Sequence, residues 1–170
     1  NISSSPFAVG KHDKIRLRML IHDAMKYKVP FIYVNQVGGN DDLVFDGNSL
    51  VISAQGRLIA QAATFKEDLI VVDIKNPSVQ IQPKNYSDIE TVHMALIAGL
   101  RDYVTKCGFK KVVIGLSGGI DSALTAAVAV ESLGNQNVIG VLMPSQFSSQ
   151  GSIDDAVKLS QNLGIVYKVI

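Results

Sequence analysis

The stretch Ser117-Gly118-Gly119-Ile120-Asp121-Ser122 combines two hydroxyls, two glycines and one carboxylate. The apolar run before it, residues 112–116, is rich in β-branched side chains and is typical of a buried parallel strand. The residues after it place alanine, leucine and valine on one face at helical spacing. Glycines let a ligand approach the main chain, and the free N–H groups at a helix start attract anions. The stretch therefore predicts an anion site, most naturally for phosphate, at a strand-to-helix turn.

Two common phosphate-binding motifs do not fit this turn. A P-loop needs G-x-x-x-x-G-K-[ST], and no lysine follows Gly119. A dinucleotide fingerprint needs G-x-G-x-x-G and an acid about 20 residues further on, at the end of the next strand. The glycines here have another spacing, and the next apolar run, residues 138–143, ends in Met-Pro-Ser. A glycine-rich turn without any ligand stays open as the alternative.

The elements that position this turn form a repeating strand-and-helix pattern. Strand 112–116, the helix after the turn and strand 138–143 have the length of a βαβ unit, which predicts parallel strands and a right-handed crossover. The carboxyl ends of the two strands, where ligands bind in such sheets, lie at Leu116 and Met143. A further helix is expected to be capped by Ser152 and to stop at Gly164, before a third strand over 165–170.

The first half of the chain shows a different pattern, with a helix followed by short strands. The helix is expected over 11–28, with its basic residues, Arg16 among them, on a solvated face. A turn is expected at residues 38–41. This order predicts an α+β layer that is antiparallel at this end. The expected strands cover residues 31–37, 43–45, 49–53, 57–62 and 69–74.

Residues 76–86 carry two prolines and polar filler without any period, which indicates a linker. The chain is therefore divided into a first domain over 1–75, this linker, and a second domain over 87–170. Ser87 and Glu90 have the spacing of a capping box, which predicts a helix from Ser87 to Lys106. Its apolar stripe ends at Cys107, so this cysteine is expected to be packed in the core rather than to act as a nucleophile.

The hexapeptide resembles the S-G-G-x-D-S signature of the ATP pyrophosphatase (PP-loop) superfamily, whose members cleave ATP between the α and β phosphates. Residues 143–149, Met-Pro-Ser-Gln-Phe-Ser-Ser, resemble the M-P-S-x-[YF]-S-S loop of glutamine-dependent NAD synthetases. Residues 1–7, 34–39 and 45–49 are similar to the end of the nitrilase-type glutaminase domain of that family. The resemblance implies an α/β fold. The C-terminal end of a nitrilase-like sandwich would be followed by the first βαβ units of a parallel-sheet, adenine-nucleotide α-hydrolase-like domain.

The resemblance also implies an activity, the ATP-dependent amidation of nicotinic acid adenine dinucleotide to NAD. The carboxylate would be adenylylated with release of pyrophosphate, and ammonia from glutamine would then displace AMP. ATP and Mg²⁺ are the implied cofactors. Large members of the family assemble into homo-oligomers. Two alternatives stay open: another PP-loop enzyme, such as a GMP synthetase, an asparagine synthetase or a tRNA-thiolating enzyme, or a non-catalytic nucleotide-binding module.

Several residues receive a role from this resemblance. Asp121 would bind Mg²⁺, with capping of the helix as its alternative role. Ser5 and Lys11 would line the glutamine pocket, with a turn serine and a surface lysine as the alternative. The ATP site would be formed by Gly115, by the backbone N–H groups from Ser117 through Gly118, Gly119 and Ile120, by Asp121, by the Ser117 and Ser122 hydroxyls, and by the backbone of Leu142 and Met143. Ser145, Ser148 and Ser149 would join from the following loop.

The glutaminase triad of the family, Glu-Lys-Cys, would lie before Asn1, and further metal and substrate residues would follow Ile170. The chain is therefore expected to be part of a longer protein and to be inactive by itself. The net charge of +1 gives no reason to expect nucleic acid or an anionic membrane as a partner. The single cysteine fits a reducing compartment, so a cytoplasmic location is expected.

Overall fold

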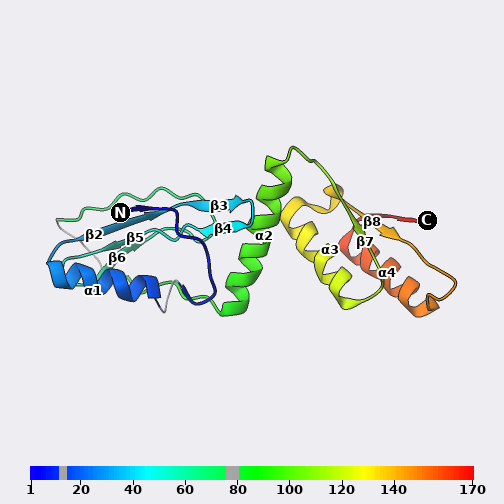
Figure 1. Ribbon diagram of the computed structural model, residues 1–170, viewed down its shortest axis with the longest axis horizontal. Coiled ribbons are helices and arrows are strands. Elements are labelled where there is room, and N and C mark those ends of the chain that lie inside the picture. Colours follow the sequence, from blue (N-terminus) through cyan, green and yellow to red (C-terminus); the bar gives the residue numbers. More distant parts are fainter. Residues whose placement is uncertain (12–14, 76–80) are drawn as a thin grey trace. The chain divides into compact units, whose positions relative to one another are not determined.

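The computed structural model describes residues 1–11, 15–75 and 81–170, which fall into two compact units, Asn1–Gly99 and Leu100–Ile170 (Figure 1). Helix α2 (Asp88–Lys106) contributes residues to both units. The described part of the sequence-predicted linker, 81–86, has no regular secondary structure, and residues 76–80 lie outside the described ranges. The domain limits inferred from the sequence stay a prediction.

The first unit is built around a four-stranded sheet in the order β1-β2-β5-β6. Its strands are β1 (Ile2–Ser3), β2 (Phe31–Asn35), β5 (Leu50–Ile52) and β6 (Leu58–Gln61). Strand β1 pairs with β2 in parallel, and the other pairs are antiparallel. Helix α1 (Leu17–Tyr27) packs on this sheet through a buried cluster (Figure 1). The buried members of that cluster are Leu20, Ala24, Tyr33, Leu50, Ile52 and Leu58.

The predicted helix over 11–28 is found over Leu17–Tyr27, with residues 12–14 outside the described ranges. The expectation that its basic residues face solvent is wrong for Arg16, which is only 3% exposed. A buried carboxylate partner, Asp46, offsets the cost of removing this charge from water. That partner lies 30 residues away in the sequence, beyond the reach of helical periodicity.

A two-stranded ribbon, β3 (Val37–Asn40) and β4 (Leu43–Asp46), completes the strands of the first unit's described residues. The turn expected at residues 38–41 is displaced, because Gly38 and Gly39 pair with Phe45 and Val44 inside this ribbon. The reversal takes place at Asp41, which has a positive φ of 50°. Aspartate tolerates this left-handed region better than most residues do.

Residues 69–74 do not form the predicted strand, and Leu69 and Val71 are 90% and 94% exposed. An apolar, β-branched run favours a strand only where a neighbouring strand supplies hydrogen bonds, and no described strand pairs with this run.

Helix α2 begins as predicted. The Ser87 backbone N–H donates to the Glu90 carboxylate at 2.7 Å, and the Glu90 N–H donates to the Ser87 hydroxyl at 3.2 Å. This reciprocal pair confirms the capping box.

The predicted burial of Cys107 is wrong, since its side chain is exposed. Helix α2 instead buries Ala95 and Ala98, together with Phe65, in the first unit, and Val104 in the second. Small alanine side chains allow close packing of a helix, so the buried face is not the one that carries the larger apolar residues. Helical spacing alone does not decide between two such faces.

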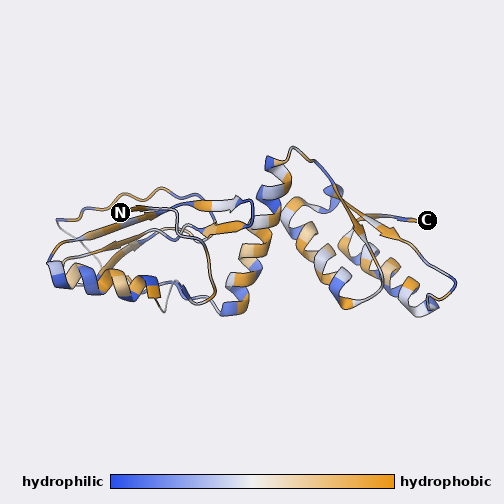
Figure 2. Ribbon diagram, in the orientation of Figure 1, coloured by the Kyte–Doolittle hydropathy of each residue, from blue (hydrophilic) through white to orange (hydrophobic). Residues whose placement is uncertain are grey.

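The second unit has the predicted parallel α/β architecture, with strand order β7-β8-β9 and both pairs parallel. The strands are β7 (Val112–Gly115), β8 (Val138–Leu142) and β9 (Val166–Val169). Helix α3 (Ile120–Leu133), followed by the short 3-10 turn η2 (Asn135–Asn137), connects β7 to β8, and helix α4 (Gln150–Leu163) connects β8 to β9. Figure 2 colours β7 and β8 mainly as hydrophobic, as expected for strands of a parallel sheet.

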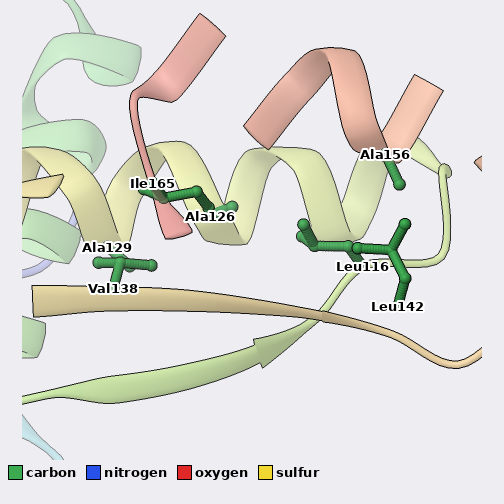
Figure 3. Close-up of a cluster of buried hydrophobic side chains, with 7 residues drawn as sticks. All are labelled: Leu116, Ala126, Ala129, Val138, Leu142, Ala156 and Ile165. Carbon is green, nitrogen blue, oxygen red and sulfur yellow. The ribbon is translucent and has the colours of Figure 1, made fainter. Parts of the chain in front are cut away.

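One core cluster holds the sheet of the second unit against α3 and α4 (Figure 3). Alanines on the helices let them approach the strands closely, and Gly140 gives room to Leu116, because a Cβ there would lie 2.7 Å from its Cδ1. The cluster ends at Leu116 and Leu142, which lie at the carboxyl edge of the sheet. Its buried members are Leu116, Ala126, Ala129, Val138, Leu142, Ala156 and Ile165.

Candidate functional site

The predicted phosphate loop lies between β7 and α3, at the carboxyl edge of the parallel sheet. The parallel register pairs Gly115 with Val141, and the Leu116 N–H donates to the Val141 carbonyl at 2.8 Å. The ends of β7 and β8 therefore lie side by side, as the βαβ pattern predicts. Ligands of open α/β sheets bind at this edge, and the N-terminus of α3 supplies free N–H groups there.

Gly118 has a positive φ of 80° and lies against the start of α4. A Cβ at this position would come within 2.3 Å of the Ser152 carbonyl oxygen and 2.7 Å of the Ser152 Cα. Glycine is therefore required by the packing of the protein itself. Gly119 differs, because its φ is −89° and a Cβ would meet only the Ser117 hydroxyl, at 3.3 Å.

The two loop hydroxyls form a small network with the main chain. Ser117 Oγ and Ser122 Oγ lie 3.1 Å apart. Ser117 Oγ accepts from the Gly119 N–H at 3.2 Å, and Ser122 Oγ accepts from the Ser117 N–H at 3.3 Å and donates to the Gly119 carbonyl at 2.9 Å. Two of the N–H groups assigned to a phosphate are thus satisfied by hydroxyls. An entering phosphate would exchange these bonds for its own.

Asp121 is exposed in the first turn of α3, where a carboxylate and the helix dipole attract each other. The N-cap position is held by Gly119 without any side-chain cap, so Asp121 is not the residue that caps this helix. Among residues 1–11, 15–75 and 81–170, no group of three or more His, Cys, Asp or Glu side chains has the geometry to hold a metal ion.

Gly115 and Met143 meet at the ends of β7 and β8, since a Cβ on Gly115 would lie 3.4 Å from Met143 Cε. Met143 is 63% exposed, whereas Leu142 is 2% exposed and points into the core (Figure 3). The Leu142 carbonyl accepts from the Ile170 N–H at 3.0 Å. The structure thus brings Gly115 and Met143 together beside the loop, while Leu142 offers no side-chain atom to a ligand.

The serine-rich segment after β8 folds back on itself. Ser148 Oγ accepts from the Ser145 N–H at 2.9 Å, and Ser149 caps α4 by accepting from the Ser152 N–H at 3.2 Å. The cap was expected at Ser152, so helix α4 begins about one turn earlier than the sequence suggested. Several serines in a row give equally good caps locally, and packing of the α4 start against Gly118 selects one of them.

Ser5 and Lys11, the two residues assigned to a glutamine pocket, line one cavity of about 170 Å³ in the first unit. The Lys11 ammonium donates to the Pro6 carbonyl at 2.9 Å, which fixes its position at the cavity wall. The other described lining residues are Asn1, Ser3, Ile15, Arg16, Met19, Leu20 and Tyr33. The cavity is therefore lined both by apolar side chains and by hydrogen-bond donors.

Three buried polar residues next to Ser5 were not identified from the sequence. Arg16 donates to both carboxylate oxygens of Asp46, at 2.7 and 3.0 Å, and Asn35 donates to the same carboxylate at 2.9 Å. The sequence pattern places Arg16 on a solvated face and assigns no role to Asn35 or Asp46. An arginine on an otherwise apolar helix face was the one available indication that it has a buried partner.

Two families match the chain, one on each half. Residues 2–84 match the carbon-nitrogen hydrolase family, and residues 92–170 match the NAD synthase family. Curated relatives span both halves. The chain is 48% identical to a glutamine-dependent NAD(+) synthetase of Synechocystis sp. over 97% of its own length, and 43% identical to one of Thermotoga maritima, also over 97%. The chain belongs to the glutamine-dependent NAD(+) synthetase family.

Solved structures of this family have the same fold. A glutamine-dependent NAD+ synthetase from Acinetobacter baumannii, in complex with adenosine diphosphate, matches 98% of the chain with a TM-score of 0.89 and 40% identity. One from Cytophaga hutchinsonii matches 99% of the chain with a TM-score of 0.84 at 22% identity, a likeness of fold alone. These matches confirm the predicted order, in which a nitrilase-type end precedes the start of an NAD synthetase domain.

The chain spans about 30% of the Synechocystis relative, 35% of the Thermotoga relative and 32% of the Acinetobacter structure. The two candidate sites lie in the two parts that match different families, with the cavity of Ser5 in the first and the loop of Asp121 in the second. None of the helices in the described residues is both long and apolar enough to cross a membrane.

Proposed function

We propose that the intact protein converts nicotinic acid adenine dinucleotide to NAD, using ATP and ammonia released from glutamine. The observation that carries this proposal is the joint match, in one chain and in this order, to a carbon-nitrogen hydrolase segment and an NAD synthase segment. The loop at the carboxyl edge of the parallel sheet supports the same proposal, because it is the position where such sheets bind nucleotides.

The loop would act on ATP during adenylylation of the nicotinate carboxylate. The N–H groups at the start of α3, together with the hydroxyls of Ser117 and Ser122, would hold the departing pyrophosphate. Gly115 and Met143 lie close together beside the loop, where the backbone of Leu142 and Met143 would contact adenine. Hydrogen bonds that strengthen as negative charge moves onto the pyrophosphate lower the barrier of this step.

Mg²⁺ belongs to this proposal through Asp121. Magnesium in nucleotide sites usually takes one or two carboxylates, substrate phosphate oxygens and waters, so a single exposed carboxylate beside the loop fits it. Asp121 would hold the ion, whose positive charge would offset the repulsion between this carboxylate and the polyphosphate. A metal site that needs three protein ligands would not fit the described residues.

Ser5 and Lys11 would hold glutamine in the first unit. Their cavity is large enough for part of an amino acid, and an ammonium with a hydroxyl suits a carboxylate. The cysteine nucleophile and its partners would come from outside this chain, so the chain by itself would not hydrolyse glutamine. A cytoplasmic location and a homo-oligomeric assembly belong to the same proposal.

The test uses the full-length protein with nicotinic acid adenine dinucleotide, ATP and Mg²⁺, and with either glutamine or ammonium chloride. NAD, AMP and pyrophosphate should form in equal amounts with both nitrogen sources, and glutamate should appear only with glutamine. Formation of ADP and phosphate would contradict a pyrophosphatase loop. Xanthosine monophosphate or aspartate, offered in place of the dinucleotide, should give no amidated product.

A further inference from the structure

The carboxylate of Asp46 accepts hydrogen bonds from two buried side chains, Arg16 and Asn35, next to Ser5. Arg16 Nη1 and Nη2 donate to its two oxygens at 2.7 and 3.0 Å, and Asn35 Nδ2 donates to one of them at 2.9 Å. Arg16, Asn35 and Asp46 are only 3%, 8% and 3% exposed. We call these three residues the Ser5 clamp. Bidentate, charge-assisted bonds of this kind fix the guanidinium plane far better than a single contact does.

The Ser5 clamp holds Ser5 from both its main chain and its side chain. The Ser5 N–H donates to Asn35 Oδ1 at 2.9 Å, and Asn35 Nδ2 donates to the Ser5 carbonyl at 3.1 Å. Arg16 Nη2 lies 3.5 Å from Ser5 Oγ, at the long end of the hydrogen-bond range. A guanidinium has donors only, so Ser5 Oγ accepts on that side and its own proton is left for another acceptor.

Ser5, Arg16 and Tyr33 all line the 170 Å³ cavity. Arg16 Nε and the Tyr33 hydroxyl are buried and have no hydrogen-bond partner among the described residues. Buried donors without a partner are rare and costly, and an acceptor that enters the cavity would satisfy the Tyr33 hydroxyl. Asp46 already neutralises Arg16, which leaves Lys11 as the unpaired cationic side chain on the described lining.

We propose that Arg16 is a positioning residue for glutamine. Arg16 is held in place by Asp46 and donates to the Ser5 hydroxyl, so that this hydroxyl donates its own proton to the substrate in a hydrogen bond. The inference rests on the proposed function, in which Ser5 and Lys11 hold glutamine. It adds a residue that acts through Ser5 and does not itself need to touch the substrate. Lysine cannot replace it, because an ammonium lacks the fork that binds Asp46 and reaches Ser5 together.

The experiment is a double-mutant cycle in the full-length enzyme, with Ser5→Ala, Arg16→Lys and both together. The Michaelis constant for glutamine is measured for each variant, with ammonia-driven NAD formation and the thermal melt as references. Ser5→Ala should raise the glutamine KM about tenfold, the scale of one hydrogen bond to a charged group. Arg16→Lys should raise the glutamine KM severalfold in the enzyme that keeps Ser5, and not at all in the Ser5→Ala variant. Arg18→Lys, an exposed change on the same helix, is the matched control.

Each outcome decides a different question. An enzyme that makes NAD from ammonia but never from glutamine would overturn the proposed function. A normal glutamine KM in Ser5→Ala would remove Ser5 from the substrate and the inference with it. If Arg16→Lys raises the KM equally in both Ser5 backgrounds, or slows the ammonia reaction as well, then Arg16 is a structural residue only and the inference fails.

A second variant covers the case in which Arg16→Lys does not fold. Replacing Arg16 by Met and Asp46 by Leu together removes both charges of the buried pair, an exchange that proteins often tolerate. Its thermal melt shows whether the fold is kept. Its glutamine KM should rise to that of Ser5→Ala. Adding Ser5→Ala to the double variant should then change the glutamine KM no further. A glutamine KM equal to that of the native enzyme would overturn the role of Arg16.

Discussion

Gly118 lies in backbone contact with Ser152, so that a Cβ on Gly118 would come within 2.3 Å of the Ser152 carbonyl oxygen. The predicted phosphate loop is thus packed against the start of helix α4. Glycine therefore occupies these two loop positions for different physical reasons. Gly118 is required by a positive φ and by this contact, whereas Gly119 leaves the main chain open on the side of the helix N-terminus.

The first prediction separates these two reasons by replacing each glycine with alanine. Gly118→Ala should destabilise the second unit, because the left-handed conformation alone costs about 1–2 kcal/mol and the Ser152 backbone must also move. Gly119→Ala should melt close to the native protein and should weaken ATP binding, because its Cβ occupies space beside the free N–H groups. Thermal melts and ATP titrations of the full-length protein measure both effects. Equal stability losses for the two variants would contradict the assignment.

The second prediction concerns the charge of Asp121. Asp121→Asn should change the free energy of unfolding by less than about 1 kcal/mol, because the side chain is exposed and Gly119 holds the cap position. Adenylylation should fall by about 10²-fold or more, the usual scale for deleting a charge-stabilising group. The measurement is ATP–pyrophosphate exchange with nicotinic acid adenine dinucleotide at several Mg²⁺ concentrations.

Glu131→Gln is the control for Asp121, because it removes the same charge near the other end of α3. It should leave the exchange rate unchanged. Native exchange in Asp121→Asn, together with a native melt, would show that this carboxylate has no part in metal or phosphate binding.

The third prediction tests the cavity of Ser5 and Lys11. Replacing Lys11 by Ala should raise the glutamine KM about tenfold or more, because the ligand carboxylate loses the cation on the described lining. The rate with saturating ammonia should stay the same, since we propose that this reaction uses the loop of the second unit. Ser4→Ala, an exposed serine beside Ser5, serves as the control. If the variant loses activity to the same extent with glutamine and with ammonia, the cavity does not hold glutamine.

The fourth prediction follows from the capping box of α2. The backbone N–H of Ser87, and after it the Ser87 hydroxyl, lower the pKa of Glu90 below its ordinary value of 4.5. A carboxyl whose pKa is lower in the folded state stabilises the fold above its unfolded pKa and loses that contribution as pH falls through the folded pKa. Glu90→Gln should therefore lower the melting temperature at neutral pH, and the difference from the native protein should shrink below about pH 4. A constant difference between pH 7 and pH 3 would contradict this account.

Much of the second unit could be predicted from the sequence, because its determinants are local. The β-branched run before the loop, the glycines and the helical spacing after them act within a few residues of one another, so strand, turn and helix follow from neighbours in the chain. The capping box of Ser87 and Glu90 is local in the same sense. The parallel pairing of β7 with β8 then follows from the length and handedness of one crossover.

Only the tertiary structure decided the features that depend on partners far away in the sequence. Arg16 is buried because Asp46 reaches it from 30 residues away, residues 69–74 form no strand because no described strand pairs with them, and Cys107 is exposed because α2 packs through other residues. The same holds for Gly118, whose glycine is required by Ser152 on another helix. Burial, charge compensation and steric exclusion depend on which surfaces meet, and periodicity along the chain does not determine that.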